Sequence, residues 1–354
     1  NTPDGEAGRV SGVFKLMGPH FEKRAQAIAG ETIAFGKLDN AKTGDTLSSG
    51  KQVHGWLGKV HPYPPVLAIA VQARELKDDG KLGQAFSKLT EEDPSLTVVH
   101  NAENHEVVIW GQGEMHLRVA NERLGDRFAV PVSTRPPSIG YRETIRKPIT
   151  LRGRHKKQSG GHGQFAVATL RVEPLERGEG FEFVDKIVGG AISRSYIPAV
   201  QRGVEETMAA GGVNGHPVVD VRVTLLDGKE HSVDSSEMAF RIAGRLGFRE
   251  AMAKAGPVVL EPISRLDVTV PAEQLGDVMG DLNARRGRVQ GTEPGDLGEQ
   301  VIYALVPQSE LLRYAVELRS LTGGRGRFVA EHDHYDAVPA HLVDAIRKEV
   351  HEAD

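Results

Sequence analysis

The sequence contains no cysteine among its 354 residues, which excludes disulfide bonds, cysteine-ligated zinc and thiol catalysis. Aromatic residues are scarce, at 5%, whereas glycine occurs 41 times. This balance indicates several small modules of sheet and helix joined by many turns, and not one large aromatic core. At roughly 100–200 residues per domain, the length corresponds to about two to four domains.

Long apolar runs and a strong net charge are also missing. No run approaches the roughly 18 apolar residues of a membrane-spanning helix, and the chain begins without a signal-peptide pattern. We therefore expect no membrane partner, and the lack of cysteine fits a cytoplasmic protein. The net charge is −4, so any contact with nucleic acid must come from local basic patches.

Catalytic motifs are absent as well. There is no phosphate-binding G-x-x-x-x-G-K-[ST] loop and no G-x-S-x-G elbow. His332 and His334 alternate as strand residues do, which would place both imidazoles on one face. They leave open a stand-alone metal-dependent hydrolase, although two ligands from one strand do not define a site. We expect no catalytic residue and no metal in this chain.

Two segments, residues 66–133 and 262–338, show the same predicted order β-α-β-β-α-β, which is typical of a ferredoxin-like module. In each, the first strand is followed by apolar residues at helical spacing. These stripes are Leu82, Ala85, Phe86 and Leu89 in the first segment, and Leu275, Val278, Met279 and Leu282 in the second. The repeat predicts two related modules on either side of a different domain.

The remaining segments complete the predicted fold class, an α+β chain of several domains. Between the modules, strands alternate with two helices, the second opened by a capping box at Asp234 and Glu237. Residues 1–50 have the pattern of the end of a β-barrel, and a linker rich in proline, histidine and glycine follows. The tail from Pro339 is predicted to be helical.

The stretch from Thr144 to Gln164 contains no acidic residue and ends in a glycine-rich loop. Such a loop can approach a phosphate backbone with its amides and with lysine and arginine side chains. A solvated charge run is the alternative interpretation. Two further basic, glycine-punctuated clusters at 285–288 and 319–327 indicate a large polyanion touched at several places. RNA fits better than duplex DNA, because no helix-turn-helix or finger pattern appears.

Several longer motifs occur in a fixed order along the chain: Thr43–Leu47, Leu89–Pro94, Gly111–Leu117, Tyr141–Ile145, Lys157–Phe165, Tyr196–Val200, His231–Glu237, Leu260–Ile263 and Leu318–Thr322. On these motifs the sequence resembles elongation factor G over essentially its whole length, from the end of that family's second domain to the C-terminus. The resemblance implies the following parts: 1–57, the end of β-barrel domain II; 58–133, ferredoxin-like domain III; 134–256, domain IV, similar to the second domain of ribosomal protein S5; 257–338, ferredoxin-like domain V; and 339–354, a C-terminal helix packing on domain IV.

The resemblance also implies a role for particular residues. Domain IV of the family enters the decoding region of the small ribosomal subunit and follows the tRNA–mRNA pair. Its first tip loop corresponds to Lys156, Lys157, Gln158, Ser159, Gly160, Gly161, His162, Gly163 and Gln164, and the other tip loops contain Gly190, Ile192, Arg194 and His231. Contacts of domain V with ribosomal RNA are expected at Arg285, Arg286, Arg288, Arg325 and Arg327.

The implied function is that of a ribosome-binding elongation factor in protein biosynthesis, which promotes GTP-dependent translocation of tRNA and mRNA. GTP and Mg²⁺ would bind to an N-terminal GTPase domain that this sequence lacks, so the full-length parent would be a translational GTPase. We expect the ribosome, tRNA and mRNA as partners, no DNA, and a monomer.

Two departures from the family pattern favour an elongation factor G-like paralogue. His162 stands where an arginine is usual, and Ser193-Arg194-Ser195 stands where the translocase commonly has a Pro-Gly turn. A neutral imidazole above about pH 6.5 removes one permanent charge from the loop. The alternative function is therefore ribosome binding for recycling, splitting or hibernation without translocation.

Overall fold

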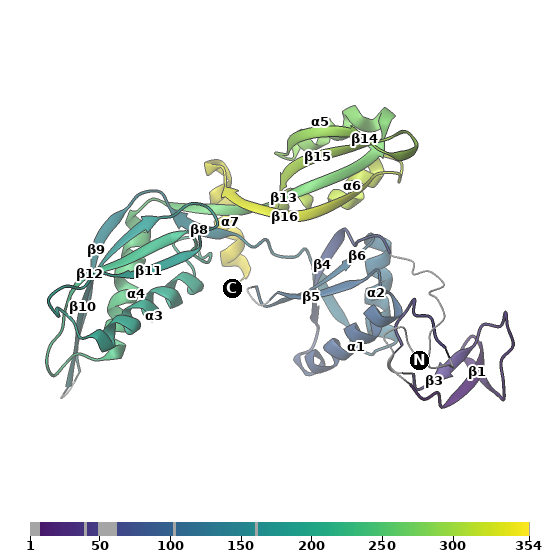
Figure 1. The fold of residues 1–354 in the computed structure, drawn as a ribbon, viewed down its shortest axis with the longest axis horizontal. Helices are drawn as coiled ribbons and strands as arrows, with labels where there is room; N and C mark the ends of the chain where they lie inside the picture. Colours follow the sequence, from purple (N-terminus) through teal and green to yellow (C-terminus); the bar gives the residue numbers. More distant parts are fainter. Residues whose placement is uncertain (1–7, 39–40, 49–61, 102–103, 160–161, 354) are drawn as a thin grey trace. The chain divides into compact units, whose positions relative to one another are not determined.

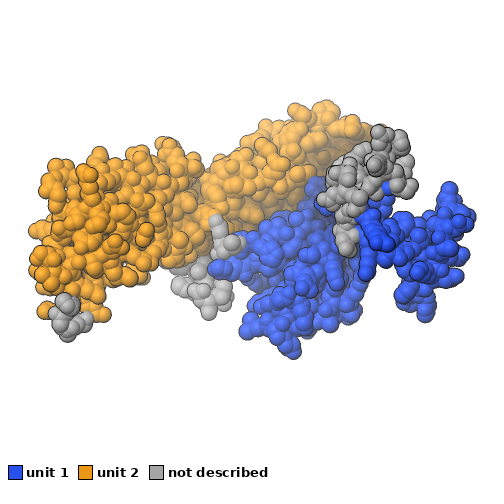
Figure 2. Space-filling view, turned by 60° about the horizontal axis from the view of Figure 1, so that its bottom comes forward, with its two compact units in different colours: residues 1–137 blue, residues 138–354 orange. Residues whose placement is uncertain are grey.

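The computed structural model describes residues 8–38, 41–48, 62–101, 104–159 and 162–353. The chain divides into two compact units, residues 1–137 and 138–354 (Figure 2). Each unit is described by itself. Among the described residues, no helix has the length and apolar character needed to cross a bilayer.

The first unit begins with a small antiparallel sheet of three strands in the order β2-β1-β3. The strands are β1 (Gly12–Met17), β2 (His20–Arg24) and β3 (Ala34–Gly36). Phe14 and Phe21 meet edge to face across it, with ring centroids 5.8 Å apart. The β structure predicted for this segment is therefore present, as an antiparallel sheet.

The rest of the first unit is a ferredoxin-like module, as predicted. Its elements are β4 (Leu67–Ala73), η1 (Leu76–Asp78), α1 (Asp79–Glu92), β5 (Thr97–Asn101), β6 (Glu106–Gly111), α2 (Glu114–Asp126) and β7 (Val132–Arg135). The strands form one antiparallel sheet in the order β5-β6-β4-β7. The predicted stripe of α1 is buried, and Leu117, Ala120 and Leu124 of α2 are buried with it.

The second unit contains the other ferredoxin-like module, also as predicted. Its elements are β13 (Pro257–Pro271), η3 (Ala272–Gln274), α5 (Leu275–Ala284), β14 (Arg288–Pro294), η4 (Asp296–Gly298), β15 (Glu299–Pro307), η5 (Gln308–Leu311), α6 (Tyr314–Leu321) and β16 (Arg327–Ala337). The sheet order β14-β15-β13-β16 repeats the topology of the first module. The start of β13 pairs with β8 (Arg142–Ile145), which adds a fifth strand to this sheet.

Between β8 and β13 lies a different α+β fold, here called the middle domain (Figure 1). It comprises β9 (Ile149–Ser159), β10 (His162–Pro174), β11 (Phe181–Asp185), η2 (Arg194–Tyr196), α3 (Ile197–Ala210), β12 (Val221–Lys229) and α4 (Glu237–Lys254). The sheet order is β11-β12-β10-β9, with β11 parallel to β12 and the other pairs antiparallel. Buried residues of both helices pack on one face of this sheet.

Glycines allow unusually close packing in the middle domain. A Cβ on Gly153 of β9 would lie 2.0 Å from the carbonyl oxygen of Ala243 in α4. A Cβ on Gly203 of α3 would lie 2.1 Å from the carbonyl oxygen of Arg241. Only glycine permits these approaches, so α4 lies directly against both β9 and α3.

Helix α4 corrects one prediction of the sequence. The N-cap is Ser236, whose hydroxyl accepts a hydrogen bond from the amide of Ala239 at 3.2 Å. The capping box predicted at Asp234 and Glu237 is therefore wrong. Glu237 is the first helical residue, and Asp234 instead binds the β9–β10 hairpin.

Helix α7 (Ala340–Ala353) follows the second module. Its residues Leu342, Val343 and Ile346 form a small apolar cluster with residues in or next to the strands β8, β13 and β16. These partners are Tyr141, Val259 and Val338. The helix predicted from the tail is present, and it packs against these residues.

Candidate functional site

Three loops meet at one end of the middle domain, here called the tip. They are the β9–β10 hairpin, residues 186–195 after β11, and residues 230–236 between β12 and α4. The strand register explains the convergence, because β9, β10 and β12 are neighbours and Lys229 pairs with Val167 near the hairpin. The predicted tip-loop residues that the structure describes therefore lie at one end of one sheet.

Asp234 and Ser235 attach the hairpin to the third loop. The Asp234 carboxylate accepts a hydrogen bond from the amide of Gly163 at 3.2 Å, and its backbone carbonyl accepts one from the amide of Phe165 at 2.8 Å. The hydroxyl of Ser235 donates to the carbonyl of Phe165 at 2.7 Å. A Cβ on Gly163 would lie 2.8 Å from the Asp234 carboxyl group, so this contact requires glycine.

Glu230 holds the second loop in the same way. Its carboxylate accepts from the amide of Ser193 at 2.8 Å and from the Ser193 hydroxyl at 3.2 Å. Ile192 is 1% exposed, and a Cβ on Gly228 would lie 2.8 Å from its side chain. Ile192 therefore anchors the loop from inside and does not present a contact surface itself.

The predicted contact residues differ in how the structure places them. Lys156, Lys157, Gln158, Gly190, Arg194 and His231 are exposed. The side-chain oxygen of Gln164 lies 2.8 Å from Nε2 of His155 across the hairpin and accepts a hydrogen bond from it. Gly160 and Gly161 lie outside the described residues, as do the side chains of Ser159 and His162. The described part of the tip therefore presents positively charged side chains and exposed backbone, and the hydrogen bonds of Asp234 and Glu230 hold its loops in place.

Two of the predicted arginines of the second module, Arg285 and Arg286, are largely shielded from solvent and bound to other residues. Arg285 donates to Asp281 at 2.8 and 3.1 Å, to the carbonyl of Glu310 at 3.0 Å and to Glu317. Its guanidinium also lies 5.1 Å from the ring centroid of Tyr314. The hydrogen bonds to Asp281 and Glu317 raise the pKa of Arg285, which is the expected effect of charge-assisted bonds.

Arg286 is also bound by several groups. It makes a two-point ion pair with Glu261 at 2.6 and 3.0 Å and further bonds to Glu310 at 2.9 Å and Ser309 at 3.1 Å. The side chain of Glu261 is only 5% exposed. Hydrogen bonding to Glu261 raises the pKa of Arg286. Arg286 therefore joins α5, β13 and η5, and a role in contacting RNA stays a prediction.

The other predicted arginines also have acidic partners. Arg288 lies 3.5 Å from Asp336, Arg325 lies 2.7 Å from Glu273, and Arg327 binds Glu299 at 2.6 and 2.7 Å. All three arginines are at least half exposed. Surface ion pairs of this kind are worth about 0–1 kcal/mol, so a polyanion could displace their partners at small cost.

Glu143, which the sequence analysis did not single out, organises the base of the middle domain. This fully buried carboxylate accepts the amides of Val213, Asn214 and His216 at 3.0, 2.7 and 3.1 Å, and the side-chain amide of Asn214 at 3.1 Å. Burial lowers the pKa of His216 to about 4. The sequence feature that could have drawn attention to Glu143 was its position in the motif Tyr141–Ile145.

The metal alternative loses its geometric basis. A bulge in β16 places His334 opposite Ile263 and His332 opposite Ser264, with Asp333 as the extra residue. Neighbouring strand residues point to opposite faces, so the prediction that both imidazoles share one face is wrong. Within the described part of the chain, no group of three or more histidine, aspartate and glutamate side chains could hold a metal ion.

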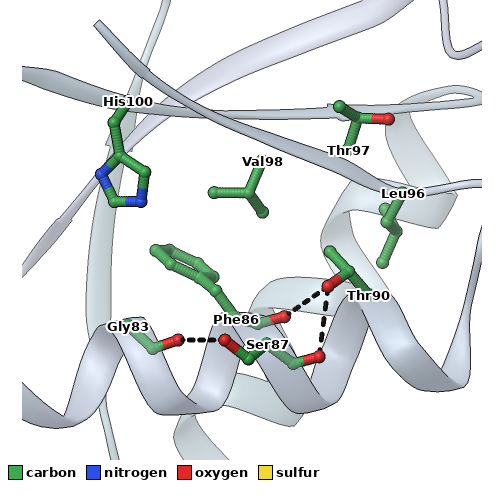
Figure 3. A pocket seen from close by; sticks show the side chains of 8 residues that line it. All are labelled: Gly83, Phe86, Ser87, Thr90, Leu96, Thr97, Val98 and His100. Carbon is green, nitrogen blue, oxygen red and sulfur yellow. Dashed lines mark hydrogen bonds between the residues drawn. The ribbon is translucent and has the colours of Figure 1, made fainter. Parts of the chain in front are cut away.

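A cavity of about 350 Å³ lies between α1 and β5 of the first module (Figure 3). The hydroxyls of Ser87 and Thr90 on its helical wall donate to the helix carbonyls of Gly83 and Phe86 at 3.1 and 3.0 Å. His100 is the one titratable residue of its lining. These hydroxyls are engaged by their own helix, and the lining contains no pair of groups placed for acid–base chemistry.

The fold and the tip define a class of protein: a multidomain α+β chain in which, along the sequence, one ferredoxin-like module precedes and another follows a domain that presents a basic loop cluster. Comparison with known proteins identifies the family. Models of elongation factor G match consecutive stretches: domain III over residues 63–136, domain IV over 137–256 and the C-terminus over 258–346. The chain belongs to the elongation factor G family.

A solved structure supports this assignment. A crystal structure of a protein from Thermus thermophilus is 37% identical in sequence and superposes with a TM-score of 0.81. The match covers 98% of this chain and 53% of that protein. The chain therefore spans about half the length of this relative.

Proposed function

We propose that this chain is the ribosome-binding part of a translation elongation factor, and that its tip contacts the tRNA–mRNA pair in the small subunit. The observation that carries the proposal is the convergence of three loops on one end of the middle domain. Lys156 and Lys157 are exposed there and make no ion pair with any described residue. Exposed lysine side chains are suited to phosphate oxygens.

Binding to ribosomes tests this proposal directly. The chain should co-sediment with ribosomes, and binding should weaken as salt rises because phosphate contacts release counterions. Lys156→Ala with Lys157→Ala should reduce binding and lower its salt dependence. Unchanged binding by this double variant would remove the tip loop from the proposal.

We assign GTP and Mg²⁺ to a domain outside these residues, because the sequence contains no phosphate-binding loop. A protein that joins this chain to such a domain would promote translocation. Toeprinting on pretranslocation ribosomes with GTP measures this: a shift of one codon supports translocation. Ribosome binding without a shift contradicts it. tRNA and mRNA as partners, a monomeric state and a cytoplasmic location stay predictions.

The second candidate is a specialised paralogue for recycling, splitting or hibernation. The second tip loop favours it, because Ser193 stands in place of the usual turn and is fixed by two hydrogen bonds to Glu230. A loop fixed in this manner is less free to adapt to a moving tRNA–mRNA pair. Subunit splitting, followed by light scattering, would support this candidate if it occurs without a toeprint shift.

A further inference from the structure

The two faces of strand β9 have different chemistry. Leu151 packs toward the helices, and Gly153 lies directly under α4. The alternate residues Arg152, Arg154 and Lys156 are exposed and therefore lie on the opposite, helix-free face of the sheet. We call this surface the open face.

The strand register places further residues beside these cations. Lys156 pairs with Phe165, Arg154 pairs with Val167, and Arg152 pairs with Thr169. On the next strand, Val167 and Thr169 pair with Lys229 and Asp227. The half of the open face near the tip therefore carries four basic side chains and the single acid Asp227 from these rows.

The half of the open face farther from the tip is different. There Arg171 binds Glu173 at 2.8 Å, and Arg222 binds Glu182 at 2.5 Å. In contrast, Arg152 and Arg154 make no ion pair with any residue that the structure describes. The same sheet face thus has a neutralised half and a half with available positive charge.

The spacing of the cations suits one extended strand of a polyanion. Residues two apart along a strand are separated by about 7 Å, so Arg152, Arg154 and Lys156 form a straight, regular column. β9 is the edge strand of its sheet, so this column is accessible from the side as well. Beside Lys156, Phe165 adds an aromatic ring, which is the usual partner of an unstacked base.

We propose that the open face binds a single strand of RNA, which runs along β9 from the tip toward the base of the middle domain. The proposal deepens the proposed function, on which it rests, and adds Arg152, Arg154 and Lys229, which the tip loops do not include. RNA is favoured over an acidic peptide because Phe165 pairs with Lys156 beside the column, and an aromatic ring can stack on an unstacked base.

Neutralisation of the column tests the proposal. The full chain with Arg152→Gln and Arg154→Gln is compared with a control carrying Arg171→Gln and Arg222→Gln, which removes the same charge from the same face. Binding to a fluorescent single-stranded RNA of 12 nucleotides is measured by anisotropy at several salt concentrations. The first variant should bind several-fold more weakly, and the slope of log K against log salt should fall by about 1.4.

The control variant should keep the slope of the original chain. Equal slopes for the two variants would overturn the proposal. So would binding of a poly-glutamate peptide of equal charge as tight as that of the RNA. Co-sedimentation with ribosomes distinguishes the two proposals. If the column variant loses RNA binding but the original chain does not sediment with ribosomes, the open face still binds RNA and the proposal of ribosome binding is contradicted.

A cross-linker can locate the RNA, because the chain has no cysteine. Thr150→Cys places one attachment point in the row of the column, and Arg202→Cys places one on exposed α3 across the sheet. A short photoreactive group at Thr150→Cys should cross-link the 12-nucleotide RNA, and the same group at Arg202→Cys should not. Equal cross-linking from both positions would contradict binding on the open face.

Discussion

Two basic clusters that look alike in the sequence have different surroundings in the structure. On β9 of the middle domain, Arg152 and Arg154 are exposed and make no ion pair with a described residue. In the second module, Arg285 and Arg286 are bound to carboxylates from several elements. A run of arginines therefore does not by itself indicate a binding surface, because the tertiary fold decides which acids lie nearby.

The strongest test of this comparison removes the arginine whose carboxylate partner is buried. Arg286→Ala leaves Glu261 buried without a partner, which should destabilise the second unit by about 3–5 kcal/mol. Urea unfolding followed by circular dichroism measures the loss. Arg286→Met with Glu261→Met is the matched control and should recover most of the stability, since no isolated charge remains. A loss below about 1 kcal/mol would show that the pair is not structural.

The next largest effect concerns a buried basic group that carries no charge. The pKa of His216 is lowered by burial to about 4, compared with about 6.5 in the unfolded chain. Below pH 6.5 the unfolded state binds the proton first, so stability should fall as pH drops toward 4, by up to about 3 kcal/mol.

His216→Phe keeps an aromatic ring beside Tyr141 and cannot take up a proton. The difference in unfolding free energy between the original chain and this variant should grow as pH falls from 7 to 5. The rate cannot exceed about 1.4 kcal/mol per pH unit for one proton. A difference that does not change with pH would contradict the buried neutral imidazole.

An exposed ion pair should matter far less. Arg325 and Glu273 lie 2.7 Å apart, and both side chains are more than half exposed. Arg325→Ala should change the free energy of unfolding by less than about 1 kcal/mol. The measurement is the same urea titration, with Arg286→Ala as the reference for a bound arginine. A loss as large as that of Arg286→Ala would remove the distinction between the two kinds of pair.

The smallest effect on stability is expected at the tip. Lys156→Ala with Lys157→Ala should shift the free energy of unfolding by less than about 0.5 kcal/mol, since both side chains are exposed. Ribosome binding, in contrast, should weaken. Thermal unfolding and co-sedimentation of the same preparation give both values. If the variant lost both stability and binding, these lysines would be structural residues like Arg286, and the distinction between the two basic clusters would be wrong.

Much of the fold could be predicted because its signals are local and periodic. The helical stripe Leu82, Ala85, Phe86 and Leu89 is buried as predicted, and both ferredoxin-like modules have the predicted element order. Such patterns depend on spacing along the chain, which the sequence displays directly.

Other features could not be predicted, because they depend on a single extra residue in a strand or on a contact with a residue far away in the sequence. The bulge at Asp333 reverses one imidazole relative to the other, and the shift of the helix cap to Ser236 frees Asp234 to bind Gly163. Ile192 was predicted as a contact residue, yet it is buried. No local pattern distinguishes these outcomes, because each is selected by contacts far away in the sequence.

The sequence by itself determined the element order, the family and the presence of concentrated positive charge. The tertiary structure alone decided which charges are available, because Glu261, Glu310 and Glu317 reach their arginines through the packing of separate elements. The sequence shows that basic residues alternate with other residues along β9, but it does not show which face of the strand is exposed to solvent. Helix α4 covers one face at Gly153, and the opposite face keeps its cations in solvent.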